Sequence, residues 1–315
     1  MYSGAQGAFH GRASQDEKIM ERFPPGERLL YSKRSRKGEI AMRRQIRYLS
    51  IILVLVLLLG GCAAGDRKGK ESPGIQGIAG AADINPQGGE EEQYSFRAEV
   101  IEAGDSLLIA PSEDSGERKS SNKITVNTAG AELVDEKGEA ITLDQLKPWD
   151  ILVITYNGII LESYPAQITA FKVERVGHNP LPEGYLALID DIYQEDTGLN
   201  GDIDTIALDT AEWTGITDED KEMIFARVKE AYGFEVIEGT FDELAEQGII
   251  NKEKLYFPKG ILIQITGVKY DSRKETITCG ISKWRSGKGA IGAEEVTARL
   301  KNGIWEITRE GEWIS

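Results

Sequence analysis

The chain has 315 residues with 37 basic and 52 acidic side chains, which gives a net charge of −15 at pH 7. Proteins bind nucleic acids largely by neutralising phosphates with Lys and Arg, so a chain this acidic is a poor candidate and we expect no nucleic-acid partner. The whole chain holds two cysteines and two histidines. A zinc site built from several His and Cys is therefore excluded, and we expect no metal and no cofactor.

A basic stretch precedes a short apolar stretch near residue 50. Three arginines lie within residues 43–47, nine apolar residues occupy 51–59, and two glycines then lead to Cys62. This order is typical of a secretory signal peptide. The apolar stretch is too short to cross a bilayer, which takes ~20 residues. The sequence therefore predicts a signal peptide at 42–61.

The sequence Leu-Gly-Gly-Cys at residues 59–62 resembles the lipobox of bacterial lipoproteins. The resemblance implies cleavage before Cys62 and a diacylglyceryl thioether on its sulfur. Two or more acyl chains hold a protein stably on a membrane. We therefore expect a lipoprotein on the outer face of the cell membrane, with the membrane as a partner through the anchor. An uncleaved anchor helix with an incidental cysteine is the alternative.

The segments on either side of the signal lack packing residues. Residues 1–41 are polar, and Met42 directly precedes the arginines, so 1–41 is interpreted either as a misassigned start or as a disordered extension. Residues 62–92 are rich in glycine and predict a flexible tether with a reach of ~30 Å. Without residues 1–61 the chain holds 26 basic and 47 acidic side chains, a net charge of −21.

Residues 93–177 predict a first domain of short strands. Apolar residues alternate with polar ones at 94–100, which is the period of a half-buried strand. Asn157-Gly158 predicts a tight hairpin between strands at 151–156 and 159–164, and one helical turn is expected at 143–146. This layout predicts a small OB-like β-barrel. Two segments also resemble a small uncharacterised domain of Gram-positive lipoproteins, namely 146–150 and 162–168.

Residues 178–184 contain two prolines and are predicted to be a linker. His178 is the one histidine after residue 61, so a Ser-His-Asp or Cys-His site would need it. An exposed loop histidine is the preferred interpretation. With Cys62 lipidated, Cys279 has no disulfide partner and is expected to be a buried structural thiol.

Residues 185–315 predict an α+β domain with a mostly antiparallel sheet and helices on one face. A strand is expected at 185–193. Capping boxes at 217–220 and 240–243 predict two helices, and strands are expected from 260 onward with a tight turn at Asn302-Gly303. The segments 282–292 and 305–315 resemble the end of a domain in clostridial-type lipoproteins.

Two loops are candidate binding sites. The first resembles part of a calcium loop, although the position that needs a bidentate Glu holds Ala207; its acidic and amide side chains are Asp196, Asn200, Asp202 and Asp204. The second is basic and glycine-rich, and such loops can present N–H groups to an anion or ligand. Its residues are Lys283, Arg285, Ser286, Gly287 and Lys288. Plain turns with solvated charges are the alternative for both.

Charge is also segregated along the second domain. Residues 182–250 hold 3 basic and 19 acidic side chains, whereas 259–301 hold 9 basic and 4 acidic. This contrast fits either a solvated acidic face or a docking surface for an envelope protein partner of complementary charge.

No catalytic pair stands out, so the sequence predicts a lipid-anchored, non-catalytic binding or interaction module. One alternative is a carboxylate-dependent cell-wall hydrolase, because glycoside hydrolysis needs only two carboxyl groups. A structural subunit of an envelope complex is the other. The carboxylates considered for the hydrolase are Asp190, Asp191, Asp202, Asp204 and Asp209.

Overall fold

The structure is a computed structural model that describes residues 92–315, all of which belong to one compact unit. The expectations for residues 1–41, for the signal peptide, for Cys62 and for nearly all of the tether lie outside the described residues. Within 92–315, no helix is both long enough and apolar enough to cross a membrane.

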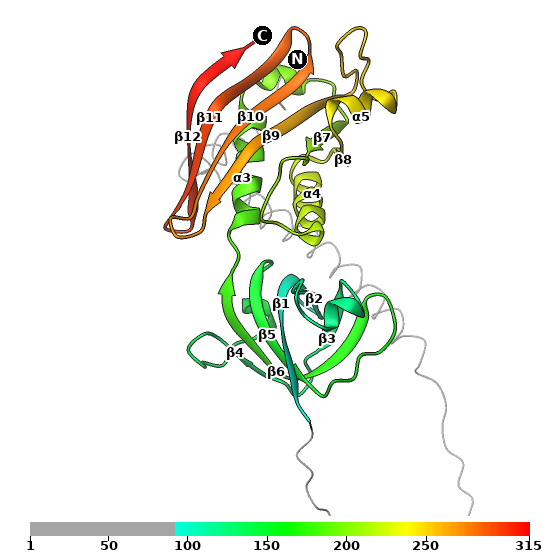
Figure 1. Cartoon of the computed structure of the whole chain (residues 1–315), viewed down its shortest axis with the longest axis vertical. Helices are drawn as coiled ribbons and strands as arrows, with labels where there is room; N and C mark the ends of the chain where they lie inside the picture. The colour runs from blue at the N-terminus through cyan, green and yellow to red at the C-terminus, as the bar shows by residue number, and fades with distance from the viewer. Residues whose placement is uncertain (1–91) are drawn as a thin grey trace, which may run out of the picture. The chain divides into compact units, whose positions relative to one another are not determined.

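Short strands form the first part of the described chain (Figure 1). Five of them close a barrel in the order β1-β2-β3-β6-β5 and back to β1; β3 runs parallel to β6, and the other neighbours are antiparallel. The short β4 pairs with the second half of β6. The strands are β1 (Tyr94–Ala103), β2 (Leu107–Pro111), β3 (Ile124–Asn127), β4 (Glu132–Val134), β5 (Asp150–Tyr156) and β6 (Ala166–His178). The expected small closed barrel is confirmed.

Alternate residues of the barrel strands fill its interior. Along β5, Leu152, Ile154 and Tyr156 are buried while the residues between them are half-buried, because successive side chains of a strand point to opposite faces. Two 3-10 turns, η1 (Glu117–Lys119) and η2 (Leu143–Gln145), lie in the connections, and η2 is the helical turn that the sequence predicts.

The predicted strand at 159–164 is wrong. β5 ends at Tyr156 and β6 begins at Ala166, so Asn157-Gly158 opens a longer loop instead of a two-residue hairpin. Only Leu161 makes a β-bridge in this loop, to Gln167 of β6. Turn residues identify a change of chain direction, but the pairing of the next strand decides how long the connection is.

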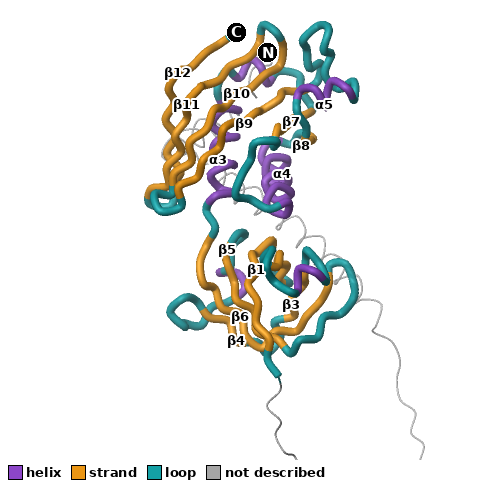
Figure 2. Tube along the Cα trace, viewed as in Figure 1, coloured by secondary structure: helices purple, strands orange, loops and turns teal. Residues whose placement is uncertain are grey.

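The second part of the chain is a six-stranded mixed sheet with helices (Figures 1 and 2). Its order is β12-β11-β10-β9-β7-β8, with β9 to β12 antiparallel and β7 parallel to both β8 and β9. The elements are α3 (Leu181–Gln194), η3 (Thr197–Asn200), β7 (Thr205–Asp209), α4 (Asp218–Tyr232), β8 (Glu235–Glu238), α5 (Phe241–Glu246), β9 (Gly260–Asp271), β10 (Thr276–Ser286), β11 (Gly289–Lys301) and β12 (Ile304–Ile314). The expected α+β class is confirmed.

The predicted strand at 185–193 is wrong, because this segment belongs to helix α3. Tyr185, Leu188, Ile189 and Ile192 are buried, and this spacing places them on one side of a helix. Only two residues separate the end of β6 from the start of the helix, so most of the predicted linker at 178–184 has regular structure. A run rich in apolar residues fits both the period of a helix and the period of a strand, and packing against the sheet decides which of the two forms.

Helices cover both faces of the sheet, not one face as expected. Ile206 and Ile263 belong to the core that includes α3 and α4. Their strand neighbours Ala207 and Leu262 belong to a separate core with Leu244 of α5. Adjacent residues of a strand point to opposite faces, so α5 lies on the face opposite α3 and α4.

The predicted helix caps and the last turn are confirmed. Thr217 and Thr240 each accept a hydrogen bond in a capping box, and Gly233 ends α4 with a φ of 75°. Asn302 and Gly303 both have positive φ, as a tight hairpin between β11 and β12 requires. β12 is the last strand of the sheet, and its outer edge pairs with no described strand.

Candidate functional site

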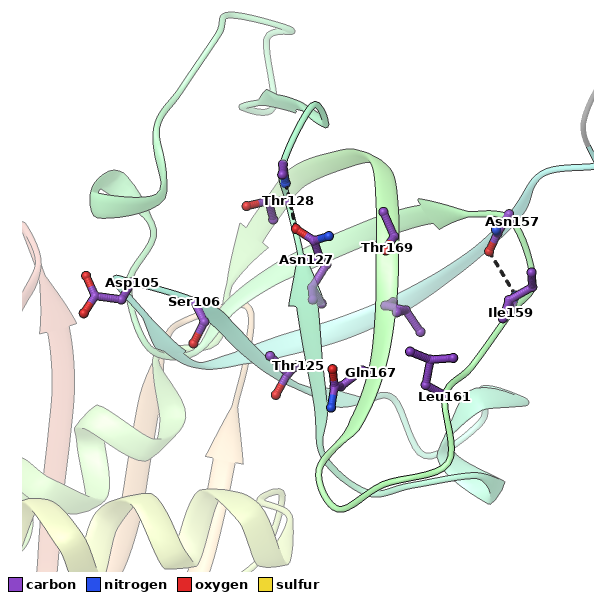
Figure 3. A pocket seen from close by; sticks show the side chains of 13 residues that line it. Asp105, Ser106, Thr125, Asn127, Thr128, Asn157, Ile159, Leu161, Gln167 and Thr169 are labelled. Carbon is purple, nitrogen blue, oxygen red and sulfur yellow. Dashed lines mark hydrogen bonds between the residues drawn. The ribbon is translucent and has the colours of Figure 1, made fainter. Parts of the chain in front are cut away.

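An open groove of about 600 Å³ lies on the outside of the barrel. Its walls come from the β1–β2 turn, from β3, from the first residues of β6, and from the loop that follows β5 (Figure 3). The lining residues include Asp105, Ser106, Thr125, Asn127, Thr128, Asn157, Ile159, Leu161, Gln167 and Thr169.

The pairing of β3 with β6 sets the floor of the groove. Thr125 lies opposite Gln167 and Asn127 lies opposite Thr169. The intervening residues on both strands are buried in the barrel core, so these four polar side chains point outward. Polar side chains on adjacent strands thereby form a compact patch.

The loop at 157–165 supplies an apolar side. Ile159 and Leu161 are 59% and 57% exposed. Two backbone hydrogen bonds hold Leu161 against β6, from Leu161 N to Gln167 O at 2.9 Å and from Gln167 N to Leu161 O at 3.2 Å. The aliphatic surface is therefore fixed beside the polar patch.

The groove offers hydrogen bonds but almost no charge. Within the described chain, the hydroxyl groups of Thr125 and Thr169 and the amide nitrogen of Asn127 have no hydrogen-bond partner; the amide oxygen of Asn127 accepts from Ala129 N at 3.1 Å. Asp105 is the one ionisable side chain among the lining residues. This chemistry suits a neutral ligand rich in hydroxyl or amide groups, and it provides no cation for a phosphate.

The basic loop predicted to hold an anion turns its first two cations inward. The Lys283 side chain is fully buried, and its ammonium donates to Tyr193 O at 3.0 Å, to Asn200 Oδ1 at 3.1 Å and to Glu195 O. Arg285 donates to Leu199 O at 2.9 Å and to Gly201 O.

The end of the same loop is open. Ser286 accepts a hydrogen bond from Lys288 N through Oγ at 3.4 Å, and Gly287 and Lys288 are exposed.

The two predicted loops therefore contact each other. Asn200 and Asp196 O bind the ammonium of Lys283, so a cation from β10 occupies the oxygen-rich side of the predicted calcium loop. Asp202 is exposed, and Asp204 accepts from Thr205 Oγ1 at 2.8 Å. Among the described residues, no group of three or more His, Cys, Asp or Glu side chains is arranged to hold a metal ion.

The carboxylates considered for hydrolysis have separate structural partners. Asp190 accepts from the hydroxyl of Tyr232, and Asp209 accepts from the amide of Gln264 at 2.9 Å. Asp191 pairs with Arg309 of β12, with 2.8 Å between Oδ2 and Nε. None of these three lines the groove.

His178 and Cys279 have structural environments. His178 ends β6, and its Nδ1 lies 2.9 Å from Asp150 Oδ1. Hydrogen bonds to Asp150 and Glu183 raise the pKa of His178 to about 9, so the ring is cationic at neutral pH. Burial raises the pKa of the Cys279 thiol to about 12, which keeps it protonated and unreactive.

Sequence reasoning missed the groove because its residues form no motif. Thr, Asn and Gln at alternate positions of a strand are ordinary surface residues. The available signal was that the polar residues 125 and 127 alternate with apolar residues, as do 167 and 169, but only the parallel pairing of β3 with β6 brings them together.

A comparison with models of known protein families gives no match, and a comparison with curated protein sequences gives none either.

Proposed function

We propose that the chain is a lipid-anchored extracytoplasmic protein that acts as a non-catalytic binding module, and that the groove on its barrel is the ligand site. The observation that carries this proposal is the lining of the groove, which combines free hydrogen-bonding groups with fixed aliphatic side chains and a single carboxylate. Such a surface can bind a polar neutral molecule, but it has no pair of groups for acid–base catalysis.

We further propose that the barrel is OB-like. Its strand order closes through a parallel pair formed by the third and fifth barrel strands, β3 and β6. In OB folds, ligands bind on the face of the second and third strands, between the loop joining strands one and two and the loop joining strands four and five. The corresponding loops here are 104–106 and 157–165, and residues of both line the groove, whose floor is formed by the third and fifth barrel strands.

The ligand class follows from the lining and from the proposed location. OB folds bind oligonucleotides or oligosaccharides. An acidic chain and a groove without Lys or Arg disfavour the first class. A neutral glycan of the cell envelope offers hydroxyl and amide groups that match Thr125, Asn127 and Gln167, and its sugar C–H faces can pack on Leu161.

The test uses the protein with Cys62 replaced by serine. Binding is measured by sedimentation with a peptidoglycan suspension and by calorimetry with soluble neutral oligosaccharides of the envelope. Thr169→Trp fills the groove and should weaken binding by at least tenfold. Asn127→Ala removes hydrogen bonds worth about 0.5–1.5 kcal/mol each, which corresponds to a loss of roughly two- to tenfold.

Thr308→Trp is the matched control, since Thr308 is an exposed threonine on β12. It should bind as the wild type does. Equal binding by Thr169→Trp and the control would show that the groove is not the site. Turnover of the glycan would contradict the non-catalytic assignment.

A further inference from the structure

A second, smaller cavity lies where the barrel meets the start of α4. It measures about 190 Å³, and its lining includes Glu99 of β1, Arg118 of η1, and Thr217, Asp220 and Met223 of the α4 region. The side chain of Trp149 also crosses this junction, because it is buried in the core of α3 and α4 although it precedes β5 of the barrel. The barrel and the α+β part are thus in contact over charged and apolar groups.

Two carboxyl groups meet in this cavity. Glu99 and Asp220 both line it, and burial together with the charge of Asp220 raises the pKa of Glu99. Asp220 is only 3% exposed, and its Oδ2 is already fixed by Thr217 N at 2.8 Å and Thr217 Oγ1 at 3.0 Å. Two carboxylates that share a buried cavity repel each other when both are ionised, so their proximity favours one bound proton.

A second protonated group, the imidazole of His178, bridges the same junction. The imidazole of His178, at the end of β6, lies 2.9 Å from Asp150 Oδ1 of β5 and 3.4 Å from Glu183 Oε2 of α3. The cationic ring therefore joins a carboxylate of the barrel to one of the first helix. A neutral ring has one N–H and can donate to only one of the two carboxylates.

The remaining charged groups at the junction are already paired. Glu219, which is 3% exposed, accepts from Arg118 at 2.8 Å and from Asn122 at 2.7 Å. Arg118 also pairs with Glu113 at 2.7 Å, and Lys123 pairs with Glu222. Asp218 lies close enough to Arg118 to act on its charge.

We propose that this junction is a proton-sensitive latch: the closed state holds a proton between Glu99 and Asp220 and another on His178, and opening releases both. The opened parts would be joined only through Asn179 and Pro180, between β6 and α3. This inference is independent of the ligand in the groove.

The direction of the pH effect follows from proton counting. Burial first, and then the neighbouring Asp220, raise the pKa of Glu99 from 4.5 to about 9. Hydrogen bonds to Asp150 and Glu183 raise that of His178 from 6.5 to about 9. Between about pH 4.5 and 9 the closed state therefore holds more proton at Glu99 than the open state does. Between about pH 6.5 and 9 the same is true at His178. Opening becomes easier as pH rises through these windows.

Glu219 does not contribute in this range. Burial opposes its charge, but the hydrogen bonds from Arg118 and Asn122 prevail and lower its pKa below 4.5. Its stabilising effect is lost only as pH falls through that lowered pKa. The window between about pH 5 and 6.5 therefore isolates the proton on Glu99.

The experiment is hydrogen exchange followed by mass spectrometry, on the protein with Cys62 replaced by serine. Peptides covering residues 144–150 and 217–224 are followed from about pH 5 to 8, and each rate is divided by the intrinsic rate at that pH. We expect the opening constant to rise by about tenfold per pH unit up to 6.5 and more steeply above it, when the second proton joins.

Glu99→Gln retains a hydrogen-bond donor to Asp220 but binds no proton, so its opening constant should be flat between about pH 5 and 6.5. Glu102→Gln changes an exposed residue of the same strand and should follow the wild type. Equal slopes in all three proteins would overturn the proposal.

If Glu99→Gln does not fold, the proposal can be tested on the protein that keeps Glu99. Carbon-13 spectra of protein labelled at the Asp and Glu carboxyl carbons should show one carboxyl group that remains protonated at neutral pH. Complete ionisation of every carboxyl group at neutral pH would overturn the proposal as well.

Discussion

At the scale of single residues, Lys283 explains how two charged loops become one structure. Its ammonium takes the position of a cation among oxygens of residues 193–200. The sequence marks both loops as charged or polar turns, but it gives no sign that a strand residue 83 positions after Asn200 reaches them. The arrangement depends on β10 lying beneath the end of α3.

Replacing Lys283 with methionine should destabilise the protein. The buried oxygens lose their shared donor, and a buried polar group without a partner costs about 1–3 kcal/mol, so we expect the free energy of unfolding at neutral pH to fall by about 3 kcal/mol. Urea denaturation measures this change. Lys288→Met, at an exposed position of the same loop, is the control and should change stability by less than about 0.5 kcal/mol.

The same pair of variants tests a pH effect. Burial lowers the pKa of Lys283 from 10.5 to about 8. Between these values the unfolded chain binds more protons than the folded one, so folding becomes more favourable as pH rises through this window. The stability advantage of the wild type over Lys283→Met should therefore grow between about pH 8 and 10. A constant difference would contradict this account.

At the scale of elements, Trp149 is the residue that anchors the barrel to its neighbour. It has a φ of 68°, an uncommon conformation for a bulky residue, and its ring is 2% exposed in the core of α3 and α4. The guanidinium of Arg227 from α4 lies 4.9 Å from the ring centroid. The strained backbone is thus accompanied by burial of a large ring and a cation–π contact.

Trp149→Ala should lower the free energy of unfolding by about 3–5 kcal/mol, the usual cost of removing a buried aromatic ring. Trp149→Phe keeps most of the apolar contact and removes an indole N–H that has no partner within residues 92–315, so its loss should be smaller. Denaturation followed by circular dichroism gives both values. Equal losses in the two variants would mean that packing of the aromatic ring is not the main contribution of Trp149 to the free energy of unfolding.

Much of the element pattern was predictable from local sequence. The capping boxes at Thr217 and Thr240 and the turn at Asn302-Gly303 use hydrogen bonds and φ values set by a few neighbouring residues. The segments 159–164 and 185–193 were misassigned because their state depends on distant partners, β6 in one case and the sheet under α3 in the other. The groove was missed for the same reason.

At the scale of the molecule, the contrast between acidic and basic segments is partly neutralised within the chain. Lys283 and Arg285 of the basic segment bind carbonyl oxygens of the acidic one. What remains is a strongly acidic protein, which anionic lipid headgroups repel. The proposed lipid on Cys62 would supply the attachment to a membrane that this charge does not favour.

Cys62→Ser should move the protein from the membrane fraction to the soluble fraction, because the variant lacks the sulfur that would carry the proposed lipid. Fractionation of cells that express each variant measures this. Cys279→Ser, at the buried thiol of β10, is the control and should remain with the membrane. Retention of Cys62→Ser on the membrane would favour an uncleaved helical anchor instead.

The open edge of β12 has a consequence for how the protein behaves when crowded. An unpaired strand edge is a template on which another chain can add, and this is how ordered aggregates begin. Here Glu306, Glu310 and Glu312 line the strand, and Gly311 bends it with a φ of 64°. Approaching edges of two molecules would bring like charges together, so the chain should stay colloidally stable at high surface density and lose that property if these glutamates were neutralised.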